Sequence, residues 1–148
     1  MKEVMMVMML GLVFMTGCVS TESYTYNLQQ STARSAGDVA MTVLLDEGIK
    51  KDEAVALCNA LVKFLEDGKI TKSILRDGVN KLLTTTFKSP QYSSYVDGVF
   101  LLIPSDIDAN EKIPENIRQL IISFVKDGAV HAANLYDPAH LPKKEDSE

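Results

Sequence analysis

Residues 57–77, "LCNALVKFLEDGKITKSILRD", carry the pattern that decides the fold. Their apolar residues recur at spacings of three and four with charged residues between them, which is typical of an amphipathic α-helix. The first helix is expected to begin near Asp52 and Glu53, because carboxylates are favourable at a helix N-terminus. It is expected to end at Gly68, a residue type that can adopt the left-handed conformation. Thr71 is then a good N-cap for a second helix, so the stretch predicts two helices joined by a tight turn.

Two more helices are predicted downstream. Gly78 lies inside the second helix and weakens it by about 1 kcal/mol relative to alanine, so a kink or a close helix contact is expected there. The pair Ser89–Pro90 is typical of a helix start, with a cap followed by a first-turn proline, and Pro104 stops that helix. Pro114 opens the last strong helix, which is expected to end at Gly128.

The size of the chain and these helices predict one compact all-α domain. A chain of 148 residues is long enough for one core and too short for two. The domain is expected over residues 38–137, as a bundle of five or six short helices. An alternative makes residues 96–103, "VDGVFLLI", a β-strand, but an isolated strand would have no partner.

Residues 57–77 resemble a second segment later in the chain. Residues 117–137, "IRQLIISFVKDGAVHAANLYD", match residues 57–77 at a constant offset of sixty, with five of 21 positions identical. One explanation is a duplicated three-helix unit, with repeats at 38–88 and 92–137. The other is that amphipathic helices followed by glycine resemble one another, and the sequence leaves both open.

The N-terminus predicts the location of the protein. Residues 4–15, "VMMVMMLGLVFM", form an apolar run of about twelve, whereas a membrane-spanning helix needs roughly 20. The run has the length of the apolar region of a secretory signal. It is followed by Thr16, Gly17 and Cys18. The order of these features resembles the lipobox of bacterial or phage-encoded lipoproteins, with Met15 where leucine is usual.

The resemblance implies that residues 1–17 are a cleaved signal peptide and that Cys18 becomes the first mature residue. In that family the cysteine carries a thioether-linked diacylglycerol and an amide-linked acyl chain such as palmitate, so Cys18 is the expected lipid-attachment site. Val19, which follows in place of the aspartate that retains lipoproteins at the inner membrane, implies the outer membrane in a Gram-negative host. An ordinary cleaved signal or a buried apolar helix ending in cysteine are the alternatives.

Two segments are predicted to flank the domain without structure. Residues 18–37 are rich in Ser, Thr and Gln and poor in aliphatic residues, a composition that buries too little surface to offset the chain entropy of folding. They are expected to form a flexible tether behind the lipid anchor. Residues 138–148 are expected to form a polar tail.

The residues that carry chemistry are few, so no catalytic, metal or cofactor site is predicted. His131 is expected at the surface beside the Gly128 turn and His140 in the tail. An enzyme would need His131 to converge with Asp77 or Asp137. Cys58 lies on the apolar face of its helix, where a thiol behaves as a small hydrophobe, so it is expected to be buried and inert. The alternative is an intermolecular disulfide.

Residues 106–117, "DIDANEKIPENI", begin like a calcium-binding loop but lack two of its essential residues. Glu111 replaces the turn glycine and Ile117 replaces the bidentate glutamate, so a solvated loop is expected instead. The Asp-Gly pairs that begin at positions 67, 77, 97 and 127 are interpreted as helix stops rather than ligands.

Charge and composition favour a binding protein. Lys and Arg total 15 against 20 Asp and Glu, a net charge of −5 without a basic stripe, which argues against nucleic acid as a partner. The first hypothesis is a non-enzymatic lipoprotein that binds another envelope protein while attached to the membrane through Cys18. The alternative is a carrier of a small apolar ligand or lipid in a pocket between the two repeats.

Overall fold

The computed structural model describes the backbone of residues 22–141 and the side chains of 26–139 and 141. Within this part of the chain the residues form helices and turns, with one isolated β-bridge between Thr71 and Lys112. The predicted all-α bundle is confirmed, and the alternative strand at 96–103 is wrong because most of that segment is helical. The elements in chain order are α2 (Glu22–Asp46), α3 (Lys51–Glu66), α4 (Lys72–Thr85), α5 (Pro90–Leu101), α6 (Glu115–Ile122), the π-helix η1 (Ser123–Val130), α7 (His131–Leu135) and the 3-10 turn η2 (Pro138–His140).

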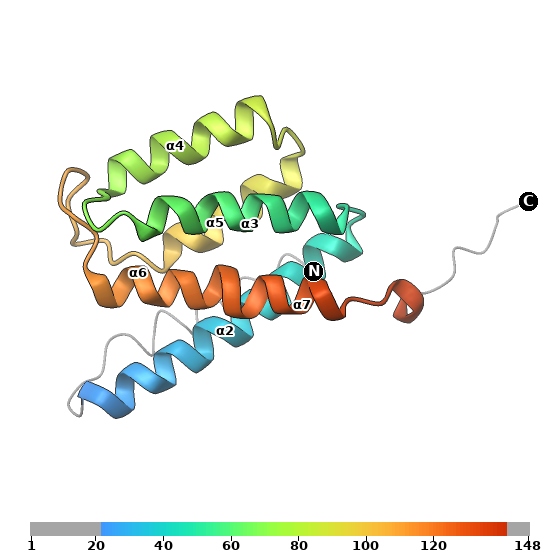
Figure 1. Ribbon diagram of the computed structural model, residues 1–148, viewed down its shortest axis with the longest axis horizontal. Coiled ribbons are helices and arrows are strands. Elements are labelled where there is room, and N and C mark those ends of the chain that lie inside the picture. The colour runs from blue at the N-terminus through green and yellow to red at the C-terminus, as the bar shows by residue number, and fades with distance from the viewer. Residues whose placement is uncertain (1–21, 142–148) are drawn as a thin grey trace, which may run out of the picture.

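The helices surround one core. Because α6, η1 and α7 follow one another without a break, they form one continuous helical segment, with α3 beside it and α2 crossing it (Figure 1). Helix α4 lies beyond α3, on the opposite side of the bundle from α2, and α5 contacts both α2 and α4. The largest fully buried side chains include Met41, Leu57, Leu61, Leu65, Leu75, Tyr92, Tyr95, Ile121 and Phe124.

Helix α2 corrects the predicted tether and domain boundary. The sequence predicts a flexible segment over residues 18–37, but the helix already begins at Glu22. Ala33, Gly37 and Ala40 are buried, although none has a large apolar side chain. Small residues at helical spacing let two backbones approach closely, so this helix is buried without the aliphatic pattern of the others. The folded domain therefore includes residues 22–37, and residues 18–21 lie outside the described part.

The close approach occurs where α2 crosses η1, its most extensive contact. A Cβ atom at Gly37 would overlap the carbonyl group of Phe124. A Cβ at Gly128 would overlap the carbonyl oxygen of Arg34 and lie 2.9 Å from the amide nitrogen of Asp38. Two glycines, one from each helix, thus allow the backbones to touch.

Gly128 does not end its helix as the sequence predicts. The chain continues through it as a π-helix and then as α7. At the offset of sixty, the turn between α3 and α4 therefore corresponds to the inside of a continuous helix. Residues 92–137 therefore lack the predicted third helix after a turn at Gly128. The duplication itself stays a prediction. Of the four Asp-Gly pairs interpreted as helix stops, only the one at 67 follows a helix end.

The end of α3 also differs from the prediction. Gly68 lacks the left-handed conformation, and Gly48 is the described glycine with positive φ, at 93°. The α3 C-terminus is held instead by Arg118 of α6, whose Nη1 donates a hydrogen bond to the carbonyl oxygen of Leu65 at 2.9 Å. A cation at this position is favourable because the last carbonyls of a helix lack intrahelical donors.

Three other local predictions are confirmed. The Thr71 hydroxyl accepts a hydrogen bond from the amide of Ile74 at 3.2 Å and caps α4. Gly78 makes a close helix contact, because a Cβ there would lie 2.8 Å from Cζ of Phe64. Helix α5 begins with Pro90 in its first turn.

Candidate functional site

Cys18, the predicted lipid-attachment site, lies outside the described residues, so its modification stays a prediction. Only residues 19–21 separate Cys18 from Glu22, the first residue of α2. Among the described helices, none combines the length and apolar composition needed to cross a bilayer.

Cys58 is buried, as predicted. Its exposed fraction is 0%, and its Sγ lies 3.4 Å from the hydroxyl oxygen of Tyr95 in a hydrogen bond. Burial raises the pKa of the Cys58 thiol to about 11, although the hydrogen bond with Tyr95 partly opposes this. The thiolate is the nucleophilic form of cysteine, so a thiol held protonated in the core is unreactive.

The two histidines lie near the C-terminal end of the last helical segment. His131 is exposed at the start of α7, which agrees with the predicted surface position. His140 ends η2, and its side chain lies outside the described part. Of the acids considered as partners for His131, Asp77 is exposed on α4 and Asp137 follows α7.

The segment 106–117 links α5 to α6 through turns and packs against the start of α4. The backbone amide of Ser73 donates to the carbonyl of Ala109 at 2.8 Å, and the Ser73 hydroxyl donates to the side chain of Asn110 at 3.2 Å. Asp106 and Asp108 are exposed. In the described part of the chain, no group of three or more His, Cys, Asp or Glu side chains is arranged to hold a metal ion.

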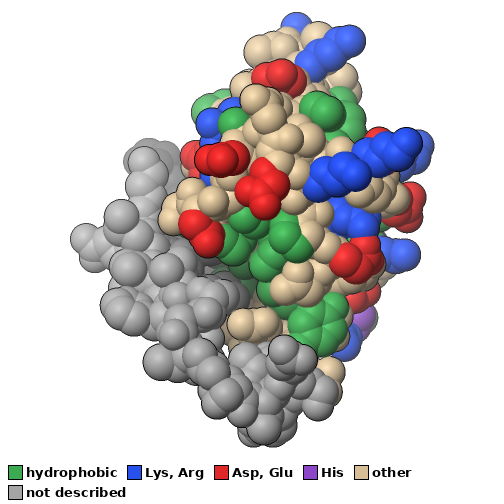
Figure 2. Space-filling model, turned by 90° about the vertical axis from the view of Figure 1, so that its left-hand side faces the viewer, with side chains coloured by type: hydrophobic (Ala, Val, Ile, Leu, Met, Phe, Trp, Pro, Cys, Tyr) green, Lys and Arg blue, Asp and Glu red, His purple; other side chains and the backbone are tan. Residues whose placement is uncertain are grey.

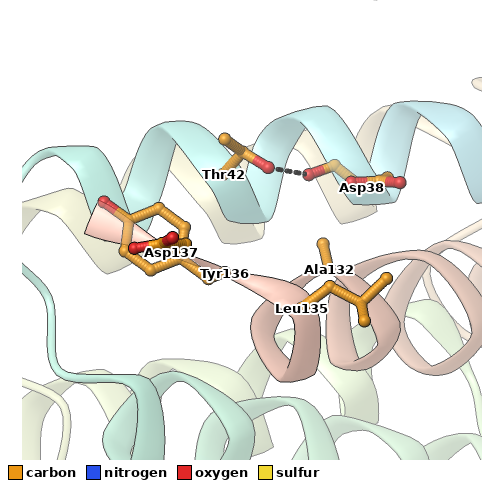
Figure 3. Close-up of a pocket in the computed structure, with 6 residues that line it drawn as sticks. All are labelled: Asp38, Thr42, Ala132, Leu135, Tyr136 and Asp137. Atoms are coloured by element: carbon orange, nitrogen blue, oxygen red, sulfur yellow. Dashed lines mark hydrogen bonds between the residues drawn. The ribbon is translucent and has the colours of Figure 1, made fainter. Parts of the chain in front are cut away.

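A surface groove lies between α2 and the end of α7 (Figure 3). Its volume is about 320 Å³, and it is open to solvent. The α2 side contributes Asp38 and Thr42 from successive turns, and the Thr42 hydroxyl donates to the Asp38 carbonyl at 2.9 Å. The opposite side is lined by Ala132, Leu135, Tyr136 and Asp137.

The groove is lined by both apolar and acidic residues. Leu135 is 70% exposed, the largest fraction among the exposed large hydrophobic side chains that the structure describes. Tyr136 donates a hydrogen bond from its hydroxyl to Oδ1 of Asp46 at 2.8 Å, which ties the end of α7 to the end of α2. Desolvation, this hydrogen bond and the charges of Asp46 and Asp137 together raise the pKa of Tyr136 to about 12. The phenol therefore remains a neutral donor at physiological pH.

Sequence reasoning did not find this groove. Asp38 and Thr42 fall where the sequence predicts the boundary of a tether, and residues near 137 were considered only as partners for His131. The spacing of Ala33, Gly37 and Ala40 was the available signal that α2 packs against another helix. Comparisons with protein-family models, curated proteins and solved structures find no match for this chain.

Proposed function

We propose that the chain is a bacterial or phage-encoded lipoprotein that acts, without catalysis, as a protein-binding module at the cell envelope. The observation that carries the proposal is the apolar run 4–15 followed directly by Thr16-Gly17-Cys18. Cys18 would carry the lipid, and Val19 after it favours the outer membrane of a Gram-negative host. Several acyl chains on one residue give stable attachment, since each buried methylene contributes about 0.8 kcal/mol.

The start of α2 determines how far the bundle can lie from a lipid anchor on Cys18. The three residues between Cys18 and Glu22 span at most about 11 Å when fully extended. The bundle would therefore remain close to the lipid headgroups rather than at the end of a twenty-residue tether. Its partner would accordingly lie at, or protrude from, the same membrane surface.

Attachment to the membrane would depend on the lipid. Figure 2 views the end of the bundle where α2 begins, and acidic side chains gather in the middle of this face with basic ones beside them. The segment between α5 and α6 lies at this end of the bundle (Figure 1), and its exposed acids are Asp106, Asp108 and Glu111. Anionic headgroups attract clusters of Lys and Arg, and a face of mixed charge offers little such attraction.

Protein binding is favoured over ligand transport by the groove between α2 and α7. An apolar cargo needs an enclosed apolar cavity. The groove is open and has Asp38 and Asp137 in its lining.

The lipid anchor is tested by metabolic labelling with a fatty acid in cells that express the full-length protein. Cys18→Ala is expected to abolish labelling and to release the protein from membranes. Cys58→Ala is the matched control, because Cys58 is buried and should not be acylated. Labelling that persists in Cys18→Ala, or that is lost in Cys58→Ala while the protein remains folded, would contradict the proposal.

A further inference from the structure

We propose that the first turns of α2, residues 22–32, form an extensible anchor segment, which detaches from the bundle and unwinds while the rest of the domain stays folded. Its release lengthens the connection between the lipid on Cys18 and the bundle. This inference deepens the proposed function and rests on its claim that Cys18 carries the lipid. The structure describes the short, wound state of the segment.

The two ends of α2 are held to the bundle unequally. None of residues 26–32 is buried. Met41, Leu44 and Leu45, toward the other end of the helix, are at most 4% exposed. The buried Ala33 lies between these two parts, where the crossing with η1 begins. Because most helix stability in proteins comes from the packing of an apolar face, the first turns of α2 are its least stable part.

One aromatic side chain provides the main apolar contact of these turns. Tyr26 is half-buried and packs against the core, whereas Leu28 is 44% exposed. The described side-chain hydrogen bonds of residues 26–32 stay inside the segment. The side-chain amide of Gln30 donates to the Tyr26 hydroxyl at 3.0 Å, and the Thr32 hydroxyl donates to the Leu28 carbonyl at 2.8 Å. Neither bond ties the segment to the bundle.

Release of the segment would also unwind it. Residues 26–32 read "YNLQQST", and Tyr, Asn, Ser and Thr are weaker helix formers than Ala or Leu. Between Ser23 and Ala33 the sequence has no Lys, Arg, Asp, Glu or His, so no ion pair within this stretch supports the helix. Isolated helices shorter than about 12–15 residues are marginal in water. The composition that predicts an unfolded segment therefore applies once Tyr26 leaves the core.

Unwinding changes how far the bundle can lie from the membrane. In the wound state residues 19–21 span at most about 11 Å, and residues 22–32 add about 16 Å along the helix axis. Fully extended, residues 19–32 would span roughly 50 Å. The released segment would therefore let the bundle reach a partner about 20 Å further from the membrane surface, while its core remains packed.

Amide hydrogen exchange of the full-length protein, resolved residue by residue, tests the release. Local opening exchanges amides at a lower free energy than global unfolding, so residues 27–32 are expected to exchange at least roughly a hundredfold faster than residues 41–45 of the same helix. Their protection should be similar from residue to residue, because one contact controls the whole segment. Equal protection in both parts of α2, or protection that rises steadily from the helix end as in simple fraying, overturns the proposal.

Two alanine variants test the contact that holds the segment. Tyr26→Ala is expected to speed the exchange of residues 27–32 about tenfold, because it removes apolar surface that is buried only in the wound state. Leu28→Ala is the matched control and should change this exchange by less than about twofold, because Leu28 is exposed. Alanine is the better helix former at both positions, so lower helix propensity cannot explain faster exchange. An equal response of the two variants overturns the proposal.

Energy transfer in a membrane tests the change of reach. The lipidated protein carries a donor fluorophore at Asn80, which is exposed on α4 at the opposite side of the bundle from α2. It is placed in vesicles of phosphatidylethanolamine and phosphatidylglycerol that contain a headgroup-labelled acceptor lipid. Tyr26→Ala is expected to lower the transfer, and Leu28→Ala should match wild type.

The outcomes distinguish this inference from the proposed function. Faster exchange in Tyr26→Ala without lower transfer overturns the extensible anchor and leaves the lipoprotein standing. A chain that carries no lipid at Cys18 overturns both proposals.

Discussion

Gly37 of α2 and Gly128 of η1 lie at the same helix crossing, where each leaves room for the backbone of the other helix. This relationship explains how the part of α2 around Gly37, which lacks large apolar side chains, packs against the core. It also positions the groove, because Asp38 follows Gly37 directly in the sequence. Among the described glycines, Gly37 and Gly128 leave the least room for an added Cβ atom.

Gly37→Ala and Gly128→Ala are each expected to destabilise the protein by about 1–3 kcal/mol or more, because the added Cβ would overlap backbone atoms that cannot move independently of their helix. Urea unfolding of the purified protein measures the loss. Gly68→Ala is the control, since a Cβ there would lie 3.7 Å from Nη2 of Arg118, an ordinary contact. Equal stabilities for all three variants would contradict the close crossing.

Gly48→Ala is expected to cost about 1–2 kcal/mol for a different reason. The Gly48 backbone has φ 93°, a conformation that L-residues with a Cβ rarely adopt, although no atom would contact the added carbon. Asparagine tolerates this region better than alanine, so Gly48→Asn should lose less stability. The urea midpoints of the two variants and of the wild type measure these losses. A Gly48→Ala variant as stable as the wild type would show that alanine is not strained at this backbone conformation.

These glycines show what the sequence determines locally and what it does not. The N-cap at Thr71, the start of α5 at Pro90 and the burial of Cys58 were predictable because each depends on neighbouring residues or on the face of one helix. The left-handed conformation was expected at Gly68 after α3 but occurs at Gly48 after α2.

The α2 helix and the groove were not predictable for a related reason. Residues 22–37 contain few large aliphatic side chains, so their composition predicts an unfolded segment. Their burial depends instead on small residues that face Gly128 of η1. Asp38 and Leu135 are about a hundred positions apart in the sequence, and only the crossing brings them to one surface. Such a site has no local signature.

Stability is expected to fall as the pH rises above 9, in part through Cys58. Its pKa is about 11 in the folded protein against 9.0 for the free thiol, so the folded state retains a proton that the unfolded state loses. Its contribution is therefore fully present below pH 9 and is lost between about pH 9 and 11, by roughly 2–3 kcal/mol. Urea midpoints across this range should decline less steeply in Cys58→Ala. The same slope in both proteins would show that other groups, such as Tyr92 and Tyr95, cause the decline.

Thr71→Ala is expected to destabilise the protein by about 1 kcal/mol, because the amide of Ile74 would lose its hydrogen-bond acceptor at the start of α4. Ser89→Ala at the start of α5 is the matched comparison. Ser89 precedes a helix in the same way but makes no side-chain cap hydrogen bond, so its loss should be smaller. Thermal unfolding of the two variants measures the difference, and the reverse order would contradict the assigned caps.

Arg118→Met is expected to cost about 1.5–3 kcal/mol, because it removes the charged donor to the Leu65 carbonyl at the end of α3 while retaining most of the apolar stem. Arg118→Lys keeps a cation there and should lose less. Glu115→Gln tests the neighbouring ion pair separately: Glu115 is 63% exposed, so its loss should stay below about 1 kcal/mol. Should Arg118→Met unfold at the same urea concentration as wild type, the cost of burying the guanidinium would equal the gain from its hydrogen bond. In that case Arg118 would cap α3 without a net gain in stability, which would contradict the expected loss.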